Sequence, residues 1–119
     1  MAATLLQEAI QLFNDRKFFE CHEALEEVWM PERGARRRFL QGLIHLAVGF
    51  HHSQRGNLEG ASLQLRKGLR KLDAYLPSCE GIDTGRLYQE VLSMLDRVEA
   101  GHGAAGYPQI HAASGSRSR

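Results

Sequence analysis

The sequence has few cysteines and no long apolar run, and each scarcity excludes a class of protein. Cys21 and Cys79 are the two thiols, and they lack the close spacing of zinc ligands, so neither a disulfide framework nor a zinc knuckle is expected. No apolar segment approaches the roughly 18 residues of a membrane span. The first residues include no basic cluster, and Glu8 interrupts their apolar pattern, unlike a secretion signal. We therefore expect a cytoplasmic protein without a membrane partner.

An excess of charge of one sign is also missing. Fifteen Lys and Arg against fourteen Asp and Glu leave a formal charge of +1, so no global field attracts nucleic acid, and no nucleic-acid partner is expected. The basic run Arg36 to Arg38 is a local exception. Such a run is typical of a solvated helix start, and as a phosphate-binding patch it lacks interleaved aromatic residues.

Helical periodicity is the main pattern that is present. Apolar residues recur at helical spacing through most of the 119 residues, and no alternating segment typical of a β-strand competes with them. Polar turns, glycines and prolines divide the pattern into about five helices, so the expected fold is all-α, a compact bundle of helical hairpins. The expected helices cover about 5–13, 18–29, 35–54, a fourth capped by Asn57 and ending near Leu76, and a fifth capped by Thr84 and ending near Glu99.

The chain divides into one helical domain, residues 1–100, and a C-terminal tail, residues 101–119. The tail is rich in Gly, Ala and Ser, which predicts a flexible, disordered segment that can be removed at small cost. Within the domain, the third helix has apolar residues or glycine nearly all round it. We expect it to be the most buried helix.

Two segments at an offset of 40 suggest a repeated hairpin. "KFFECHEAL" (Lys17 to Leu25) and "NLEGASLQL" (Asn57 to Leu65) each follow a helix and a short polar turn. The second also resembles part of a tetratricopeptide repeat, with small residues Gly60 and Ala61 where helices pack closely. Two hairpins fall short of the three repeats that a solenoid usually needs, which favours a closed bundle and leaves a peptide-binding groove as the alternative.

The segment "FFECHEALEEVW" places ionisable residues on an apolar helix face. Each residue advances about 100° around a helix, so His22 lies on the same face as Phe18, Leu25 and Trp29. Glu26 lies beside His22, one turn later. A buried carboxylate must be paired, hydrogen-bonded or protonated, and His22 is its nearest partner. We expect both side chains to be largely buried.

A polar stripe on the third helix offers further partners. Gly42 and Gly49 beside it allow a neighbouring helix to approach closely. Separations of four and seven residues return to the same helix face. The stripe consists of Gln41, His45, Val48 and His52.

If the second helix packs on this stripe, a mostly buried polar cluster forms. The pair His22 and Glu26 then faces Gln41, and His52 lies within hydrogen-bonding reach of the same pair. Trp29 closes this end of the apolar face, and we interpret it as core rather than as a ligand-stacking residue, with an indole N–H that needs one acceptor.

The same residues allow a metal site. His22, Glu26 and His52 supply two imidazoles and a carboxylate, the ligand types of many zinc and iron sites. "HEALE" is not the metalloprotease motif, and none of the four candidate histidines of the helical core, His22, His45, His51 and His52, follows a Glu at the Glu-x-x-His spacing of a di-iron bundle. A nucleophilic role for Cys21 is disfavoured, because it points about 100° away from His22. A structural polar network is the alternative to the metal site.

The segments "LFNDRKFFECHEALEEVW", "FLQGLIHLAVGFHH" and "RGNLEGASLQLRKGLRKL" together resemble domain-of-unknown-function family 309, over about Ala9 to Leu95. The resemblance implies a small all-α fold without an established activity, although some members carry the label metal-dependent hydrolase. His45 belongs to the family pattern less securely than His52. The family pattern carries over to Phe19, Glu20, His22, Glu23, Leu25, Glu26, Trp29, Gln41, Gly42, His52, Asn57, Gly60 and Ala61.

Two functional hypotheses follow. The first is a non-catalytic module that binds a protein or a small molecule at the polar cluster. The second is a metal-dependent hydrolase with His22, Glu26 and His52 as ligands of a divalent metal, the one cofactor that the sequence suggests. A homodimer is compatible with either. The candidate site residues are His22, Glu23, Glu26, Trp29, Gln41, His52 and Asn57.

Overall fold

The structure, a computed structural model, describes residues 4–103 and 106–113. Within these ranges it is all-α, as predicted, and its only β-type pairings are isolated bridges made by Ile82 with Cys79 and Ala112. The helices are α1 (Leu5–Asn14), α2 (Phe18–Trp29), α3 (Arg37–Gln54), α4 (Leu58–Leu72) and α5 (Thr84–Glu99), with a short 3₁₀ helix, η1 (Asp73–Tyr75), after α4. None of the described helices is both long and apolar enough to cross a membrane.

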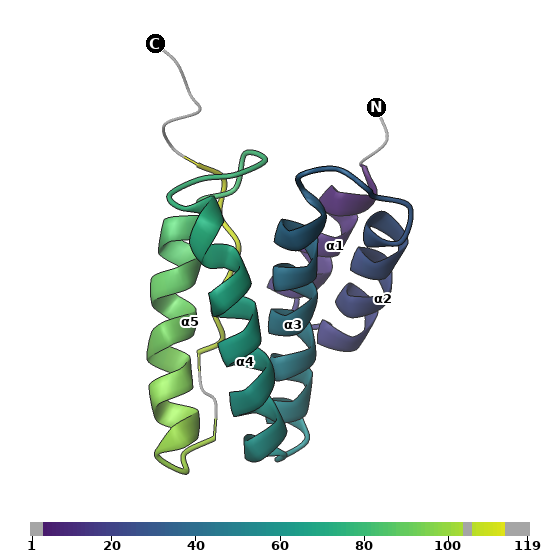
Figure 1. Ribbon diagram of the computed structural model, residues 1–119. Coiled ribbons are helices and arrows are strands. Elements are labelled where there is room, and N and C mark those ends of the chain that lie inside the picture. The colour runs from purple at the N-terminus through teal and green to yellow at the C-terminus, as the bar shows by residue number, and fades with distance from the viewer. Residues whose placement is uncertain (1–3, 104–105, 114–119) are drawn as a thin grey trace.

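Each helix packs on the next one in the chain. α1 with α2 and α3 with α4 form two hairpins, and α5 packs on α4 (Figure 1). α3 lies in the middle, between α2 and α4. It is the most buried helix, as expected, since both of its long sides carry a neighbour. The rings of Phe13, Phe18 and Phe50 pack together where α1, α2 and α3 meet.

Glycines set the close approach of α3 and α4. A Cβ atom at Gly49 would lie 2.7 Å from a methyl carbon of Leu65, and one at Gly68 would lie 3.0 Å from the carbonyl oxygen of Gly42. The prediction that Gly42 and Gly49 admit a close neighbour is therefore confirmed. The neighbour is α4, however, so the condition set for the polar cluster, that α2 packs on this side of α3, is not met.

The ends of the helices follow the sequence with two corrections. Asn57 caps α4 as predicted, because its Oδ1 accepts a hydrogen bond from the amide of Gly60 at 2.9 Å. The cap of α5 is Asp83 rather than Thr84, since its Oδ1 accepts from the amide of Arg86 at 2.9 Å. Thr84 is instead a buried first residue whose hydroxyl donates to the carbonyl of Tyr75. α4 ends at Leu72, and η1 covers Asp73–Tyr75 of the four further residues that had been expected in it, while Leu76 is extended.

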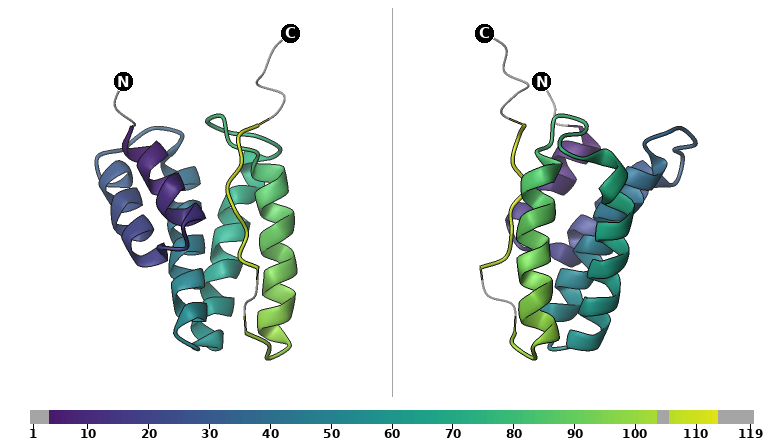
Figure 2. Two further views of the ribbon diagram at one scale, coloured as in Figure 1. Left: turned by 180° about the vertical axis from the view of Figure 1, so that it is seen from behind. Right: turned by 60° about the vertical axis from the view of Figure 1, so that its left-hand side comes forward.

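Residues 106–113 of the expected tail pack more closely than a disordered segment would. This segment runs back beside α5 and packs against the helices (Figure 2). Ile110 is buried, and its backbone bonds to the side chain of Asn14. The prediction rested on the Gly, Ala and Ser content of the tail and did not consider three residues that bury apolar surface, Tyr107, Pro108 and Ile110. The rest of the expected tail, residues 104–105 and 114–119, lies outside the described residues.

Candidate functional site

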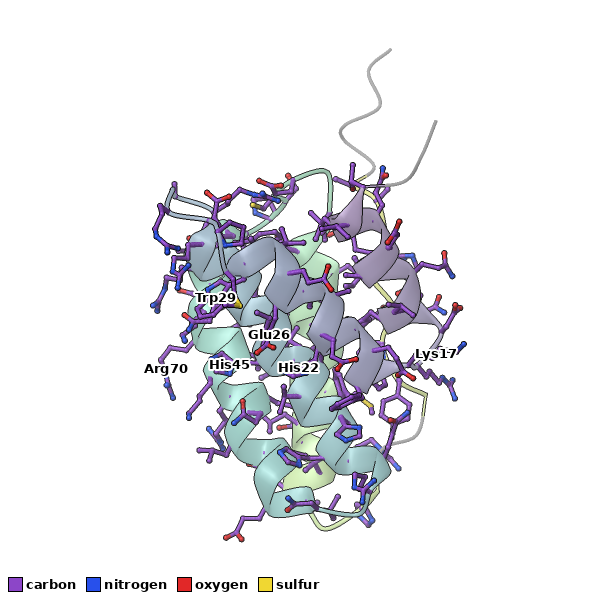
Figure 3. The ribbon with its side chains drawn as sticks, turned by 90° about the vertical axis from the view of Figure 1, so that its right-hand side faces the viewer. Lys17, His22, Glu26, Trp29, His45 and Arg70 are labelled. Atoms are coloured by element: carbon purple, nitrogen blue, oxygen red, sulfur yellow. The ribbon has the colours of Figure 1, made fainter. Side chains whose placement is uncertain are left out.

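The predicted site residues of α2 gather on one face of the molecule. His22, Glu26 and Trp29 lie along one edge of α2 in Figure 3, with His45 of α3 beside them and Arg70 of α4 at the edge of the molecule. Spacings of four and seven residues place the three α2 side chains on one helix face. We call this surface, formed by α2, α3 and α4, the polar face.

His22 and Glu26 pair with each other, as predicted. Nε2 of His22 lies 3.1 Å from Oε2 of Glu26. The expectation that both are largely buried is wrong, because the side chains are 25% and 45% exposed. At 45% exposure the Glu26 carboxylate keeps much of its hydration. A pair this exposed contributes little to the free energy of unfolding.

The other predicted members of the cluster do not join this pair. In the part of the chain that the structure describes, neither Gln41 nor His52 forms a hydrogen bond with His22 or Glu26. Nδ1 of His52 instead lies 3.3 Å from Nδ2 of Asn57, the residue that caps α4. The physical reason is the packing of α3, whose glycines lie against α4 and whose His45 bonds to Gln64 and Lys71 of that helix.

His45 is the better connected histidine of this face. Its Nδ1 lies 2.8 Å from Oε1 of Gln64, and its Nε2 lies 3.0 Å from Nζ of Lys71, both residues of α4. An ammonium group only donates, so Nε2 accepts from Lys71 and the proton on Nδ1 is donated to Gln64. These contacts select the neutral imidazole. Burial lowers the pKa of His45; the bond to Gln64 opposes this shift, while the charges of Lys71 and Lys67 add to it.

Four cations of the polar face lack an acidic partner. Burial lowers the pKa of Lys71, and the nearby charges of Arg38, Lys67 and Arg70 lower it further. Among residues 4–103 and 106–113, none of these four side chains takes part in an ion pair. We call Arg38, Lys67, Arg70 and Lys71 the basic cluster.

The run Arg36 to Arg38 separates into three different roles. Arg36 forms ion pairs with Glu32 and Glu80. Arg37 turns toward α2, and Arg38 joins the basic cluster. The run is therefore not a single patch, and one of its three charges is available on the polar face.

Trp29 packs against the core, as expected, and is covered by Arg37. The guanidinium group of Arg37 lies 4.1 Å from the centre of the indole ring and donates hydrogen bonds to the carbonyls of Trp29 and Glu32. This cation–π contact fixes the loop between α2 and α3. The indole Nε1 is buried and has no hydrogen-bond partner among the described residues, so the acceptor that we expected for it is not found there.

A complete set of metal ligands is not assembled in the described ranges. No three His, Cys, Asp or Glu side chains of residues 4–103 and 106–113 lie where they could hold one ion. His22 and Glu26 supply two adjacent groups, and His52 is engaged with Asn57 instead. Cys21 is buried in the core, and burial raises the pKa of its thiol to about 12, which opposes a role as a nucleophile.

Sequence reasoning missed the contribution of α4 to this face. Gln64, Lys67 and Lys71 recur at spacings of three and four residues, which places them on one side of a helix. That spacing was the available signal. It becomes informative once α4, rather than α2, is known to lie against the glycines of α3.

The fold and this face define a small helical protein with a half-exposed surface of histidine, glutamine and basic side chains. Residues 6–63 match the family described as "Domain of unknown function (DUF309)". The resemblance noted from the sequence is thereby confirmed.

Two uncharacterized proteins are similar to this chain over most of its length. YpuF of Bacillus subtilis (strain 168) is 36% identical over 93 residues, which cover 76% of this chain and 53% of that protein. A protein of Aquifex aeolicus (strain VF5) is 28% identical over 101 residues, which cover 84% of this chain and 30% of that protein. The chain thus spans about half of the first relative and less than a third of the second.

Proposed function

We propose that this chain is a non-catalytic binding module whose polar face binds an acidic segment of a partner protein. The observation that carries the proposal is the basic cluster, four cations from α3 and α4 beside His45 without an acidic partner among the described residues. Like charges held together repel one another, and a bound anion relieves that repulsion. Complementary charge also steers association.

The shape of the cluster favours a chain of carboxylates over a single small anion. Lys67, Arg70 and Lys71 extend along more than one turn of α4, and Arg38 adds a charge from the neighbouring helix. Successive carboxylates of a peptide can reach charges spread in this way. Glu26, at the α2 edge of the same face, suits a basic residue of that peptide and fixes its direction.

Binding of a short fluorescein-labelled poly-glutamate peptide tests the proposal. Fluorescence anisotropy at low salt compares the wild type with a Lys67→Gln/Arg70→Gln variant. An Arg55→Gln/Arg97→Gln variant is the control, since it removes the same charge from exposed positions outside the cluster. We expect the cluster variant to weaken binding by about tenfold, equivalent to about 1.4 kcal/mol, and the control to change it much less.

The net charge of the chain is the competing explanation. If both variants lost the same affinity, net charge rather than the cluster would govern binding, and the proposal would be wrong. A poly-glutamine peptide of the same length supplies the uncharged reference. Added salt should weaken the poly-glutamate complex in the wild type, because exposed charges are screened over about 10 Å at 0.1 M ionic strength.

A further inference from the structure

Residues 106–113 are bound to the helices as an extended peptide is bound by a receptor. The side chain of Asn14, the last residue of α1, donates to the carbonyl of Ile110 at 3.0 Å and accepts from its amide at 2.7 Å. The amide of Asp83 donates to the carbonyl of His111 at 2.8 Å, and the amide of Ala113 donates to the carbonyl of Gly81 at 2.9 Å. These bonds hold backbone atoms, so they do not depend on the side chains of the bound segment.

Two side chains anchor the segment. The ring of Tyr107 lies 5.3 Å from that of Phe18 and 5.6 Å from that of Phe50, centre to centre, and the guanidinium group of Arg16 lies 5.5 Å from its centre. Ile110 is 6% exposed and belongs to the core cluster. The aromatic residue and the aliphatic residue three positions later determine which sequences fit this surface. The backbone hydrogen bonds hold the segment in its extended conformation.

The way in which the segment is joined to α5 suits a reversible contact. Residues 101–103, the described part of the connection, are exposed. Three of the described residues between α5 and Tyr107 are glycines, Gly101, Gly103 and Gly106, and glycine-rich sequences are typical of flexible linkers. Release of the segment would uncover the rings of Phe18 and Phe50, an apolar surface that requires an occupant.

We propose that the surface formed by Asn14, Arg16, Phe18, Phe50 and the α4–α5 loop is a docking site for an extended segment of a partner protein. The segment carries an aromatic residue and, three positions later, an aliphatic one. Residues 106–113 occupy this site within the chain and compete with the partner. The site lies on other residues than the basic cluster and is independent of the function proposed above.

A labelled peptide with the sequence of residues 106–113, "GYPQIHAA", is the probe, and the full-length chain is the receptor. A tethered segment competes at an effective concentration in the mM range, so the wild type should bind the peptide weakly. A Tyr107→Ser/Ile110→Ser variant weakens the internal competitor and should bind the peptide at least about tenfold more tightly. In that background, Asn14→Ala should reduce the affinity by about fivefold or more, because two hydrogen bonds are lost.

Matched controls distinguish peptide binding at this site from non-specific binding to exposed apolar side chains. A Leu63→Ser/Leu92→Ser variant removes two exposed apolar side chains elsewhere and should leave peptide binding at the wild-type level. A peptide with serine in place of its tyrosine and isoleucine should not bind. A folded Tyr107→Ser/Ile110→Ser variant that fails to bind "GYPQIHAA" would overturn the proposal.

Two other results would also overturn it. Loss of the helical circular-dichroism signal in the Tyr107→Ser/Ile110→Ser variant would show that the segment is a permanent part of the core. A wild-type dimer that dissociates when the peptide is added would show that the site serves exchange of segments between two copies of the chain. Wild-type protein that stays monomeric while the opened variant binds the peptide supports a partner in trans.

Discussion

Nε2 of His45 accepts a hydrogen bond from Nζ of Lys71 across the interface of α3 and α4, over a distance of 3.0 Å. The contact joins the polar stripe of α3 to Lys71, the member of the basic cluster that lies opposite it on α4. It requires an unprotonated Nε2, because the ammonium group of Lys71 has no acceptor. Protonation of His45 would place two cations in contact, so this pair makes the polar face sensitive to pH.

Acidification should destabilise the protein through His45. The pKa of His45 is lowered from 6.5 in the folded chain, by burial first and by Lys71 and Lys67 in addition. Below pH 6.5 the unfolded chain therefore binds more protons at this residue, and the free energy of unfolding falls as the pH drops toward the folded-state pKa. Urea unfolding between pH 7.5 and about 5 should show this loss in the wild type.

A His45→Gln variant isolates that contribution, because it has no imidazole to titrate while it keeps a polar side chain. The difference between wild type and variant should shrink or reverse as the pH falls. A parallel pH dependence in both proteins would contradict the assignment. Titration of the His45 ring by NMR supplies an independent measurement, and Lys71→Met should raise its pKa because a neighbouring positive charge is removed.

Gly49 and Gly68 should be intolerant of a methyl group. A Cβ atom at Gly49 would lie 2.7 Å from Leu65 Cδ2 and 3.2 Å from the Leu65 backbone nitrogen, and one at Gly68 would lie 3.0 Å from the Gly42 carbonyl. Overpacking of this kind costs about 1–3 kcal/mol, so each Gly→Ala change should lower the urea midpoint. Gly85→Ala is the matched control: its nearest contact is at 3.4 Å, and it should be neutral or slightly stabilising.

The bounds of α2 and the position of α3 could be read from the sequence because local chemistry determines them. The polar turn before Phe18 and Pro31 after Trp29 end the periodic segments on either side. The partner of the glycine stripe could not be read in the same way. A helical wheel shows that Gly42 and Gly49 admit a neighbour, and it does not show which helix fills the space. Gly68 of α4 was the missing signal, since close approach needs small residues on both helices.

The candidate site was predicted in part for the same reason. His22 and Glu26 pair along one helix, so their spacing suffices to predict the contact. The partners of His45 lie on α4, and their contact depends on how α3 and α4 pack. The packing of residues 106–113 could not be predicted for a different reason. The composition of the tail describes all of its residues together, whereas a few apolar side chains determine whether it packs. Tyr107 and Ile110 are two of them.

Glu26→Gln should change the stability only slightly. The Glu26 side chain is 45% exposed, so its pair with His22 is screened by water, and loss of the charge should alter the free energy of unfolding by between zero and about 1 kcal/mol. An amide also keeps a hydrogen bond to the imidazole. Urea unfolding at neutral pH measures this change. A loss above about 3 kcal/mol would indicate a buried pair, contrary to this structure.

Asn57 should act as a helix cap rather than as a ligand-binding residue. Its Oδ1 accepts from the amide of Gly60 at 2.9 Å, and its Nδ2 lies 3.3 Å from Nδ1 of His52, so both ends of the side chain are engaged inside the chain. Asn57→Ala should therefore cost about 1 kcal/mol of unfolding free energy, the usual loss for a missing cap.

Asn57→Asp distinguishes the two roles, since aspartate caps a helix as well as asparagine does and offers no amide to His52. We expect thermal and urea unfolding of the Asp variant to return close to the wild type, with poly-glutamate binding at the basic cluster unaffected in both variants. If Asn57→Asp were as unstable as Asn57→Ala, the contact with His52 rather than the cap would be the source of the stability. If the Asn57 variants lost poly-glutamate binding while their stability stayed unchanged, Asn57 would instead be a binding residue of the polar face.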